Sequence, residues 1–471
     1  MFENGNGKGI MALNRRRLLL GLAGLALAIA IPGPARAEKR EEGTIITNFN
    51  RPKSTATTET KVVTEAADAV PMLSTASPKA MQDAIARYET IETLGGWEEI
   101  STKREMRKGG SGALVETLRK RLAIEGYLAD TEVTGEKFDD AVQDAVVEFQ
   151  RSHGLKVTGR VDGPTVAELN VPVTDRLKQM RANLPRVELY AQGLFGRYIT
   201  VNIPATQLEA VNFDGKVFSR HNIIVGKPDR PSPIVAAALS DINFNPYWNA
   251  PVSIVERDII PAMLKDKNTL QKMEMKVFDG YGGPEIDPSK IDWANTPADR
   301  YFFRQEPGEK NAMATVKINF PSPFGVYMHD TPTKQLFNEK LRFESSGCVR
   351  VEQVHVLVDW ILNKQDGWDM KRIEEVSEKV ERVDVKVNIP PQLRWVYLTA
   401  WALPGGQVNF RPDIYELDGS GFITGQPTPV GELAADGRRW LDVMPPAPVQ
   451  GAQAVLPVSN EDAPLEPSRP N

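Results

Sequence analysis

Hydrophobic residues follow two different periods along this chain, and the period changes near residue 196. Before it, apolar residues recur every three or four positions, and the sharpest stripe lies between residues 138 and 149. After it, apolar and polar residues alternate, as at Ile199, Val201 and Ile203. The first period is typical of amphipathic helices and the second of half-buried strands. The sequence therefore predicts an α+β multidomain protein, with a helical region followed by a β-rich domain.

The helical region divides into a scaffold and a compact unit. Helical spacing and glycine pairs predict scaffold helices within residues 77–110 and 173–195. Between them, residues 111–172 contain three short apolar stripes separated by glycine-containing turns. This pattern predicts a three-helix bundle with its own core.

The β-rich domain is expected over residues 196–385, followed by a C-terminal strand region over residues 386–425. Strand character is interrupted from about residue 247 to 315 by a helical stretch and a segment rich in Gly, Pro and charge. Long interruptions of this kind are often functional loops. We therefore expect an inserted lid there.

The first 37 residues have the composition of an export signal. Three arginines precede an apolar run over residues 18–31, and Ala35-Arg36-Ala37 forms an Ala-x-Ala end. This predicts a signal cleaved after Ala37, so that the mature chain works in the periplasm. The apolar run is too short to span a membrane comfortably, and no later segment is long and apolar enough for a transmembrane helix. Paired arginines resemble a twin-arginine signal and equally fit the general secretion route.

Two further segments are poor in large apolar residues. Residues 38–76 are rich in Thr, Glu, Lys and Ala, and residues 426–471 are rich in Pro and Ala. Too little apolar surface is available there to offset the entropy of ordering the chain. We expect a disordered linker and a disordered tail.

The charge balance argues against a nucleic-acid partner. The whole chain has 57 basic and 62 acidic residues, for a net charge of −5. Residues 1–37 hold five basic residues and one acidic residue, so the mature chain has 52 and 61, for a net charge of −9. Nucleic-acid binding needs a basic surface.

Cys348 is the single cysteine of the chain, nineteen residues after His329. In an oxidising compartment a lone cysteine is either an inert buried side chain or a nucleophile. We expect a helix directly after Cys348, whose N-terminus would stabilise a thiolate. His329 would take the thiol proton or form an ion pair. The backbone amides of Gly347 and Cys348 could form an oxyanion hole.

Other polar residues near this motif have two interpretations each. Arg350 could bind a substrate carboxylate or brace the motif by pairing with a buried acid. Trp248 could line a cleft or pack in the core. Asp330 could orient His329 or cap a turn, and His355 is expected on a solvated helix face. The four histidines lack metal-ligand spacing, so neither a metal nor a cofactor is expected.

Residues 111–172 resemble the small peptidoglycan-binding domain found beside many wall enzymes. The resemblance implies association with the cell wall and assigns no catalytic role. The matching positions are Leu118, Gly126-Tyr127, Phe138-Asp139, Ala145-Val146, Phe149-Gln150, His153-Gly154-Leu155, Gly159, Thr165 and Leu169-Asn170.

The segment Ser345-Ser346-Gly347-Cys348-Val349-Arg350-Val351, together with the earlier His329, resembles the L,D-transpeptidase (YkuD-like) family. By matching position, the resemblance implies Cys348 as nucleophile and His329 as base. Ser346, Arg350 and Trp248 become candidate substrate-binding residues. Ser346 stands where many smaller relatives have a second His. Other matching segments are residues 226–233, 245–248, 328–332 and 395–401, typical of the large Gram-negative members with a lid.

The resemblance implies a reaction on the tetrapeptide stems of peptidoglycan. Cys348 would attack the carbonyl at the L-centre of meso-diaminopimelate, expel D-Ala and pass the acyl group to another diaminopimelate amine, giving a 3→3 cross-link. It also implies acylation by carbapenems. Alternatives with the same site are an L,D-carboxypeptidase and attachment of an outer-membrane protein to the wall. A papain-like peptidase is disfavoured because its Cys precedes its His, and a non-catalytic wall-binding protein because Cys348 and His329 are both present.

Overall fold

The computed structural model describes residues 61–62, 70–102 and 104–428 of the chain. All of these described residues belong to one compact unit. The predicted signal, most of the predicted linker and the chain beyond residue 428 lie outside the described residues. Among the described helices, none combines the length and apolar character needed to cross a membrane.

A sheet of twelve strands forms the centre of the β-rich region. Its order is β14-β6-β10-β11-β13-β4-β3-β2-β15-β5, and β1 and β12 both pair with β4. Most neighbours are antiparallel, whereas β11–β13, β12–β4 and β15–β2 are parallel. The strands are β1 (Lys61–Val62), β2 (Tyr198–Asn202), β3 (Gln207–Val211), β4 (Val217–Gly226), β5 (Val235–Ala238), β6 (Asp241–Phe244), β10 (Val316–Ile318), β11 (Met328–His329), β12 (Phe343–Ser345), β13 (Val349–Val351), β14 (Val383–Lys386) and β15 (Gln392–Val396).

Two helices of the scaffold pack against each other and share the core of the sheet, whereas the bundle between them in the sequence has a separate core. Helices α1 (Ser77–Thr93) and α5 (Val173–Ala191) share one hydrophobic cluster with β2, β3 and β15. The bundle has its own cluster, as expected. It consists of α2 (Ala113–Ile124), η3 (Asp130–Glu132), α3 (Asp140–Ser152) and α4 (Gly163–Leu169). The α+β multidomain class predicted from the sequence is confirmed.

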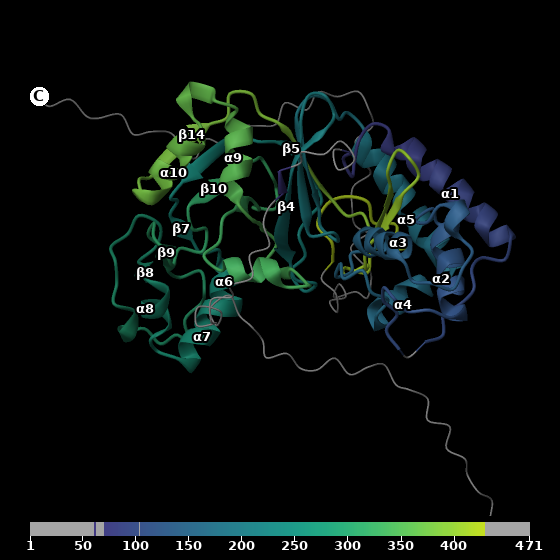
Figure 1. Cartoon of the computed structure of the whole chain (residues 1–471). Coiled ribbons are helices and arrows are strands. Elements are labelled where there is room, and N and C mark those ends of the chain that lie inside the picture. The colour runs from purple at the N-terminus through teal and green to yellow at the C-terminus, as the bar shows by residue number, and fades with distance from the viewer. Residues whose placement is uncertain (1–60, 63–69, 103, 429–471) are drawn as a thin grey trace, which may run out of the picture. The chain divides into compact units, whose positions relative to one another are not determined.

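The interruption of the β-rich domain is a small folded unit. A three-stranded sheet, ordered β7-β9-β8, and several short helices enclose a third hydrophobic cluster. These elements gather at the lower left of Figure 1. They are β7 (Trp248–Asn249), α6 (Val252–Ile254), the π-helical turn η4 (Val255–Ile259), α7 (Ile260–Lys265), α8 (Thr269–Met273), β8 (Met275–Phe278), η5 (Pro288–Lys290) and β9 (Phe302–Gln305). We call residues 247–315 the insertion.

The remaining elements follow the insertion. The apolar face of α9 packs into the main core. The elements are η6 (Lys334–Asn338), α9 (Val354–Leu362), η7 (Gln365–Gly367), α10 (Met370–Glu378), β16 (Ala400–Ala402) and β17 (Val408–Phe410), the last two forming a two-stranded sheet.

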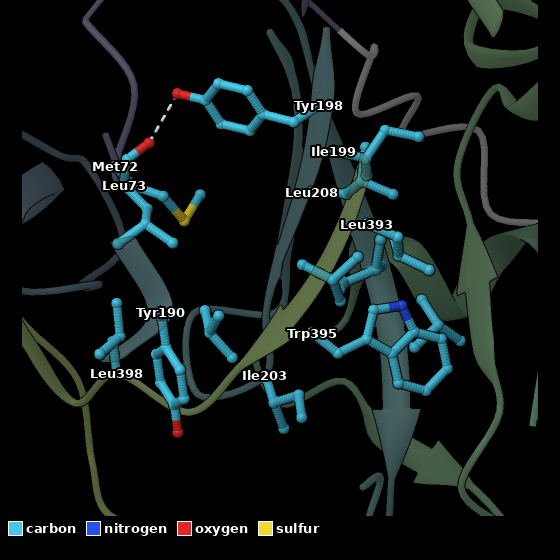
Figure 2. Packing of buried hydrophobic residues seen from close by; sticks show 14 of the residues in the cluster. Met72, Leu73, Tyr190, Tyr198, Ile199, Ile203, Leu208, Leu393, Trp395 and Leu398 are labelled. Carbon is cyan, nitrogen blue, oxygen red and sulfur yellow. Dashed lines mark hydrogen bonds between the residues drawn. The ribbon is translucent and has the colours of Figure 1, made fainter. Parts of the chain in front are cut away.

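The end of the predicted disordered linker is ordered, which corrects its boundary. Met72 and Leu73 are 2% and 0% exposed, and Figure 2 shows them against β2. The Tyr198 hydroxyl donates to the Leu73 carbonyl at 2.8 Å, and the Met72 amide donates to the Glu209 carboxylate at 2.8 Å. Two consecutive large apolar residues suffice to bury this segment, although they are too few to give a periodic signal.

The predicted end of the β-rich domain at residue 385 is also too early. Strand β15 lies between β2 and β5 inside the main sheet. The same sheet therefore includes part of the predicted C-terminal strand region. Gln426 donates to the Pro231 carbonyl at 2.7 Å, so the ordered chain extends past the predicted start of the tail.

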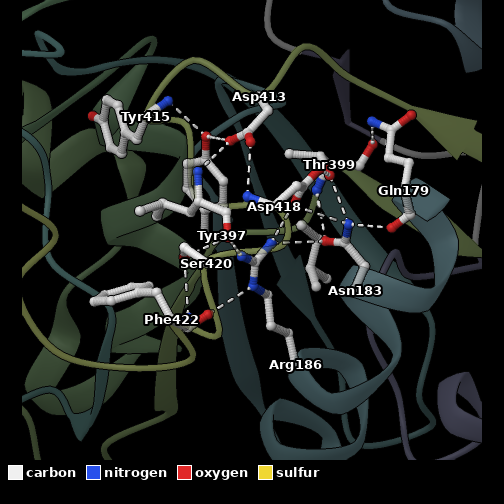
Figure 3. Close-up of polar contacts among 12 residues, drawn as sticks. Gln179, Asn183, Arg186, Tyr397, Thr399, Asp413, Tyr415, Asp418, Ser420 and Phe422 are labelled. Carbon is white, nitrogen blue, oxygen red and sulfur yellow. Dashed lines mark hydrogen bonds and ion pairs between the residues drawn. The ribbon is translucent and has the colours of Figure 1, made fainter. Parts of the chain in front are cut away.

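The segment after β15 is tied to α5 by buried polar contacts (Figure 3). Arg186 forms an ion pair with Asp418 at 2.5 Å and donates to the Phe422 carbonyl at 3.1 Å. The Asn183 amide donates to the Thr399 hydroxyl at 2.6 Å. Because Arg186 is buried, its hydrogen bonds and its carboxylate partner offset the cost of burying its charge.

Candidate active site

Three central strands place Lys317, His329 and Arg350 side by side. In the strand register, Lys317 of β10 lies opposite His329 of β11, and His329 lies opposite Arg350 of β13. The intervening positions form the core face and are 0% exposed: Val316, Ile318, Met328, Val349 and Val351. Since successive strand residues point to opposite faces, the three polar side chains share the other face. We call it the site face.

Cys348 and Tyr327 extend this face by one more row. The Val349 amide donates to the Tyr327 carbonyl at 3.1 Å, so the pairing of the two strands continues there. Cys348 lies two residues before Arg350, and Tyr327 two residues before His329. The register of β11 and β13 places Tyr327 opposite Cys348, and Tyr327 packs against the core of the insertion that contains Trp248. Cys348 therefore has Tyr327 beside it and His329 as its diagonal neighbour.

His329 is buried and held in one tautomer. Its Nδ1 lies 2.5 Å from the Asp330 carbonyl oxygen, to which it donates, so Nε2 is left as the acceptor. Burial, reinforced by the Arg350 charge, lowers the pKa of His329 to about 3. The imidazole is therefore neutral near pH 7 and able to accept a proton.

The Cys348 thiol is partly exposed and protonated at rest. Burial raises the pKa of Cys348, while the Tyr327 backbone, the Lys317 charge and the Tyr327 side chain oppose this rise. A neutral thiol beside a neutral imidazole fits the expectation that His329 takes the proton during attack. It does not fit a preformed ion pair.

The helix expected directly after Cys348 is absent at that place, which corrects this prediction. Residues Val349–Val351 form β13, and α9 begins only at Val354. The β-branched residues Val349 and Val351 pair with β11 and β4 as a central strand instead. The dipole of a helix beginning at Cys348 therefore cannot stabilise its thiolate.

Of the two backbone amides predicted for the oxyanion hole, one already donates a hydrogen bond and the other does not. Gly347 has φ +110°, a conformation that disfavours any side chain, and its N–H donates to the Ser345 hydroxyl at 3.2 Å. Within the described part of the chain, the Cys348 N–H has no such partner. The Cys348 amide is therefore the free donor, and the Tyr327 hydroxyl is a second donor near the same sulfur.

The three predicted substrate-binding residues lie around this centre in different settings. Ser346 accepts a hydrogen bond from Arg230 at 3.1 Å. Arg350 is 7% exposed and donates to the Thr333 hydroxyl at 3.3 Å, and it forms no ion pair with any described residue. Trp248 is 4% exposed in the insertion core, against which Tyr327 also packs. Their roles toward substrate stay predictions.

A polar network lies behind His329. The Asp330 carboxylate accepts from the Thr315 hydroxyl at 2.8 Å and pairs with Lys334. His355 Nε2 lies 2.9 Å from the same Thr315 hydroxyl. His355 is thus half-buried in this network, not on a solvated helix face, and Asp330 is held where its carbonyl can orient His329.

Sequence reasoning did not find Tyr327 or Lys317. Tyr327 lies two residues before His329, a spacing that puts both on one face of a strand. Lys317 lies on the preceding strand, and only the register places it opposite His329. Among the described residues, no three His, Cys, Asp or Glu side chains converge to hold a metal ion.

Two family models match the chain. Residues 196–389 match YkuD, described as "L,D-transpeptidase catalytic domain". Residues 111–169 match the model described as "Putative peptidoglycan binding domain". Both matches fall on the regions singled out by the sequence motifs.

A relative and two solved structures were compared with the chain. A "Putative L,D-transpeptidase" of Haemophilus influenzae is 36% identical over 258 residues, which cover 54% of this chain and 50% of the relative. The chain thus spans about half the length of that relative. An L,D-transpeptidase (residues 123–326) from Xylanimonas cellulosilytica is 16% identical, with 63% of this chain and 100% of that chain covered and a TM-score of 0.19. An L,D-transpeptidase from Stackebrandtia nassauensis is 12% identical, with 63% and 95% covered and a TM-score of 0.20.

Proposed function

We propose that this chain is a periplasmic peptidoglycan transpeptidase that makes 3→3 cross-links, because residues 196–389 match the YkuD model of an L,D-transpeptidase catalytic domain. The proposal rests above all on one arrangement: the Cys348 thiol lies beside the Tyr327 side chain and diagonal to His329, whose Nε2 is free to accept a proton. This arrangement supplies a nucleophile, a base and hydrogen-bond donors for acyl transfer.

The first half-reaction forms a thioester. The Cys348 sulfur attacks the carbonyl carbon at the L-centre of diaminopimelate in a tetrapeptide stem, while His329 Nε2 takes the thiol proton. The Cys348 amide and the Tyr327 hydroxyl hold the developing oxyanion. When the C–N bond breaks, His329 returns the proton to the amine of the departing D-Ala. The acyl group stays on Cys348.

The second half-reaction transfers the acyl group to an amine. The side-chain amine of a second diaminopimelate attacks the thioester carbonyl, His329 takes the amine proton, and the proton returns to the sulfur as the C–S bond breaks. The acyl energy is kept in the thioester, so no nucleotide is needed. The insertion, joined to the site by Trp248 and Tyr327, would exclude water from the thioester.

The remaining parts of the chain fit work at the wall. We expect the peptidoglycan-binding domain, matched over residues 111–169, to hold the enzyme near its substrate. The predicted export signal in residues 1–37 would deliver it to the periplasm. A carbapenem, whose ring carbonyl can acylate a thiol, would mark Cys348 as an active-site titrant.

Intact-mass spectrometry with a disaccharide-tetrapeptide donor tests the proposal. We expect the wild-type chain to gain the mass of the tripeptide acyl group and to yield a 3→3 dimer. The Cys348→Ala variant should gain nothing. A donor stem that already lacks D-Ala is the matched control, because it has no leaving amine and should give no adduct.

Other products would change the assignment. Acylation followed only by released tripeptide would identify an L,D-carboxypeptidase. Acylation resolved only by a protein amine would identify a protein-to-wall attachment enzyme. If no adduct forms while the chain still binds isolated wall, a non-catalytic wall-binding protein is the better description.

A further inference from the structure

Lys317 is a charged residue of the site face that the proposed reaction does not use. It lies opposite His329 in the register and is half-buried. Its Nζ lies 4.6 Å from the centroid of the Tyr327 ring. A cation over an aromatic face at this distance is attracted by the negative face of the ring. Lys317 therefore contacts the residue that lies opposite Cys348 in the strand register.

The Lys317 ammonium has no carboxylate partner within ion-pair distance in the part of the chain that the structure describes. Asp241 on the adjacent β6 and Asp384 on β14, one strand farther out, attract it from a greater distance, but their side chains hydrogen-bond Asn319 and Asn243. Burying an ammonium without a direct partner is costly. An apolar side chain of similar length would fill the same space at lower cost. The position is thus better explained by the charge than by packing.

The electrostatic influence of this charge on the site is direct. Lys317 opposes the burial that raises the pKa of the Cys348 thiol, and among the charged residues it has a larger effect there than Arg350. It also contributes to the low pKa of His329, after Arg350. Both effects favour a negative sulfur and a neutral imidazole, the pair needed at the moment of attack.

We propose that Lys317 is a positioning residue of this enzyme: its ammonium holds the Tyr327 ring against Cys348 and stabilises the negative charge that develops on the sulfur. A cation over the ring also makes the phenol a stronger hydrogen-bond donor to the sulfur or to the oxyanion. The inference rests on the proposed function because it takes Cys348 as the nucleophile. It assigns to β10 a role that the cysteine motif does not contain.

Other charged groups lie around the Cys348 thiol, and they are the same in the wild type and in a Lys317 variant. Arg350 lies on β13 and is flanked by Glu344, and His329 lies on β11. Arg230 reaches Ser346 from the loop after β4. A substitution of Lys317 alone leaves all of these residues unaltered. A matched control is Lys386→Met, which removes the same charge from an exposed position on β14 of the same sheet.

The experiment is the pH dependence of alkylation of the full chain by iodoacetamide. Cys348 is the only cysteine among 471 residues, so the rate reports on this thiol alone. We expect Lys317→Met to raise the apparent pKa of alkylation by about one unit, the size typical of a lost neighbouring charge. Lys317→Arg, which keeps the charge, and Lys386→Met should match the wild type. A residue that acted only through packing would not shift this value in a charge-dependent way.

The role of Lys317 and the transpeptidase assignment fail through different results. An unchanged alkylation pKa in a folded Lys317→Met variant overturns the role of Lys317, even if the wild type forms cross-links. A shifted pKa in a chain that no tetrapeptide donor acylates supports the role of Lys317 and overturns the transpeptidase assignment. If Lys317→Met does not fold, Lys317→Gln decides the question by the same measurement.

Discussion

The carboxylate of Asp258 lies 2.6 Å from the guanidinium of Arg230, joining the insertion to the loop after β4. Arg230 also donates to the Ser346 hydroxyl at 3.1 Å, two residues before Cys348. The Asp258 side chain is 4% exposed, so water screens this ion pair little. The insertion is thus linked to the cysteine loop through Arg230, and the insertion core also packs against Tyr327.

Removing the carboxylate should loosen the insertion over the thioester. For Asp258→Ala we expect the ratio of amine transfer to hydrolysis to fall roughly tenfold, which corresponds to about 1.4 kcal/mol of selectivity. The physical reason is that Arg230 loses its partner and water gains access to the acyl group. The measurement is the ratio of cross-linked dimer to released tripeptide. Asp229→Ala is the control, because Asp229 is exposed and lies 3.7 Å from the same arginine. Equal ratios in the two variants would contradict the fastening role of Asp258.

Tyr327 should contribute to acylation through its hydroxyl group. In Tyr327→Phe, the ring and its contact with Lys317 remain, but the hydroxyl of the residue opposite Cys348 is lost. We expect the single-turnover acylation rate to fall by about 10²-fold, the size typical of one lost oxyanion donor. Tyr281→Phe, at an exposed position on the insertion, should leave the rate unchanged. A wild-type rate in Tyr327→Phe would leave the Cys348 amide as the sole donor of this pair.

The neutral Cys348–His329 pair predicts a particular pH profile. Burial lowers the pKa of His329 to about 3, so the imidazole stays able to accept a proton down to that region. Below it, the imidazole is protonated and cannot act as base. We therefore expect the acylation rate to show no inflection near the ordinary histidine pKa of about 6.5. Single-turnover acylation followed by mass spectrometry would test this, with thermal unfolding at each pH as the control. An acid limb centred near that ordinary value would mean that His329 is solvated when the donor binds.

The motif residues were accessible to sequence reasoning because they are close in the chain. Cys348, Gly347 and Ser346 are consecutive, and the alternation of apolar residues predicted strands around His329. The insertion was visible because it breaks that alternation. Local patterns of this kind need no knowledge of how distant strands pair.

The partners of Cys348 were not accessible because they depend on strand pairing. Tyr327 lies beside Cys348 only because β11 and β13 run parallel, and Lys317 joins them only through the register of β10. The prediction of a helix directly after Cys348 was wrong because the apolar residues of β13 and α9 follow each other closely. Periodicity alone does not show where the strand ends and the helix begins. A central strand position, paired on both sides, decided the conformation of residues 349–351.

The turn after α3 packs against the C-terminal strands. The ring centroids of His153 and Phe410 lie 5.3 Å apart, and Arg411 donates to the Ser152 carbonyl at 2.7 Å. Gly154 has φ +64°, and a Cβ there would lie 2.7 Å from Arg411 Cδ. Gly154→Ala should therefore strain the backbone and displace Arg411 from the turn.

We expect Gly154→Ala to destabilise the bundle by about 1–2 kcal/mol. Hydrogen exchange of α3, together with thermal unfolding, measures this loss. Gly163→Ala is the control, because nothing lies within 4 Å of its added methyl group and its φ lies outside the left-handed region. That variant should keep the stability of the wild type or gain slightly from the helical preference of alanine. Equal losses in both variants would mean that the contact between Gly154 and Arg411 does not hold the bundle in place.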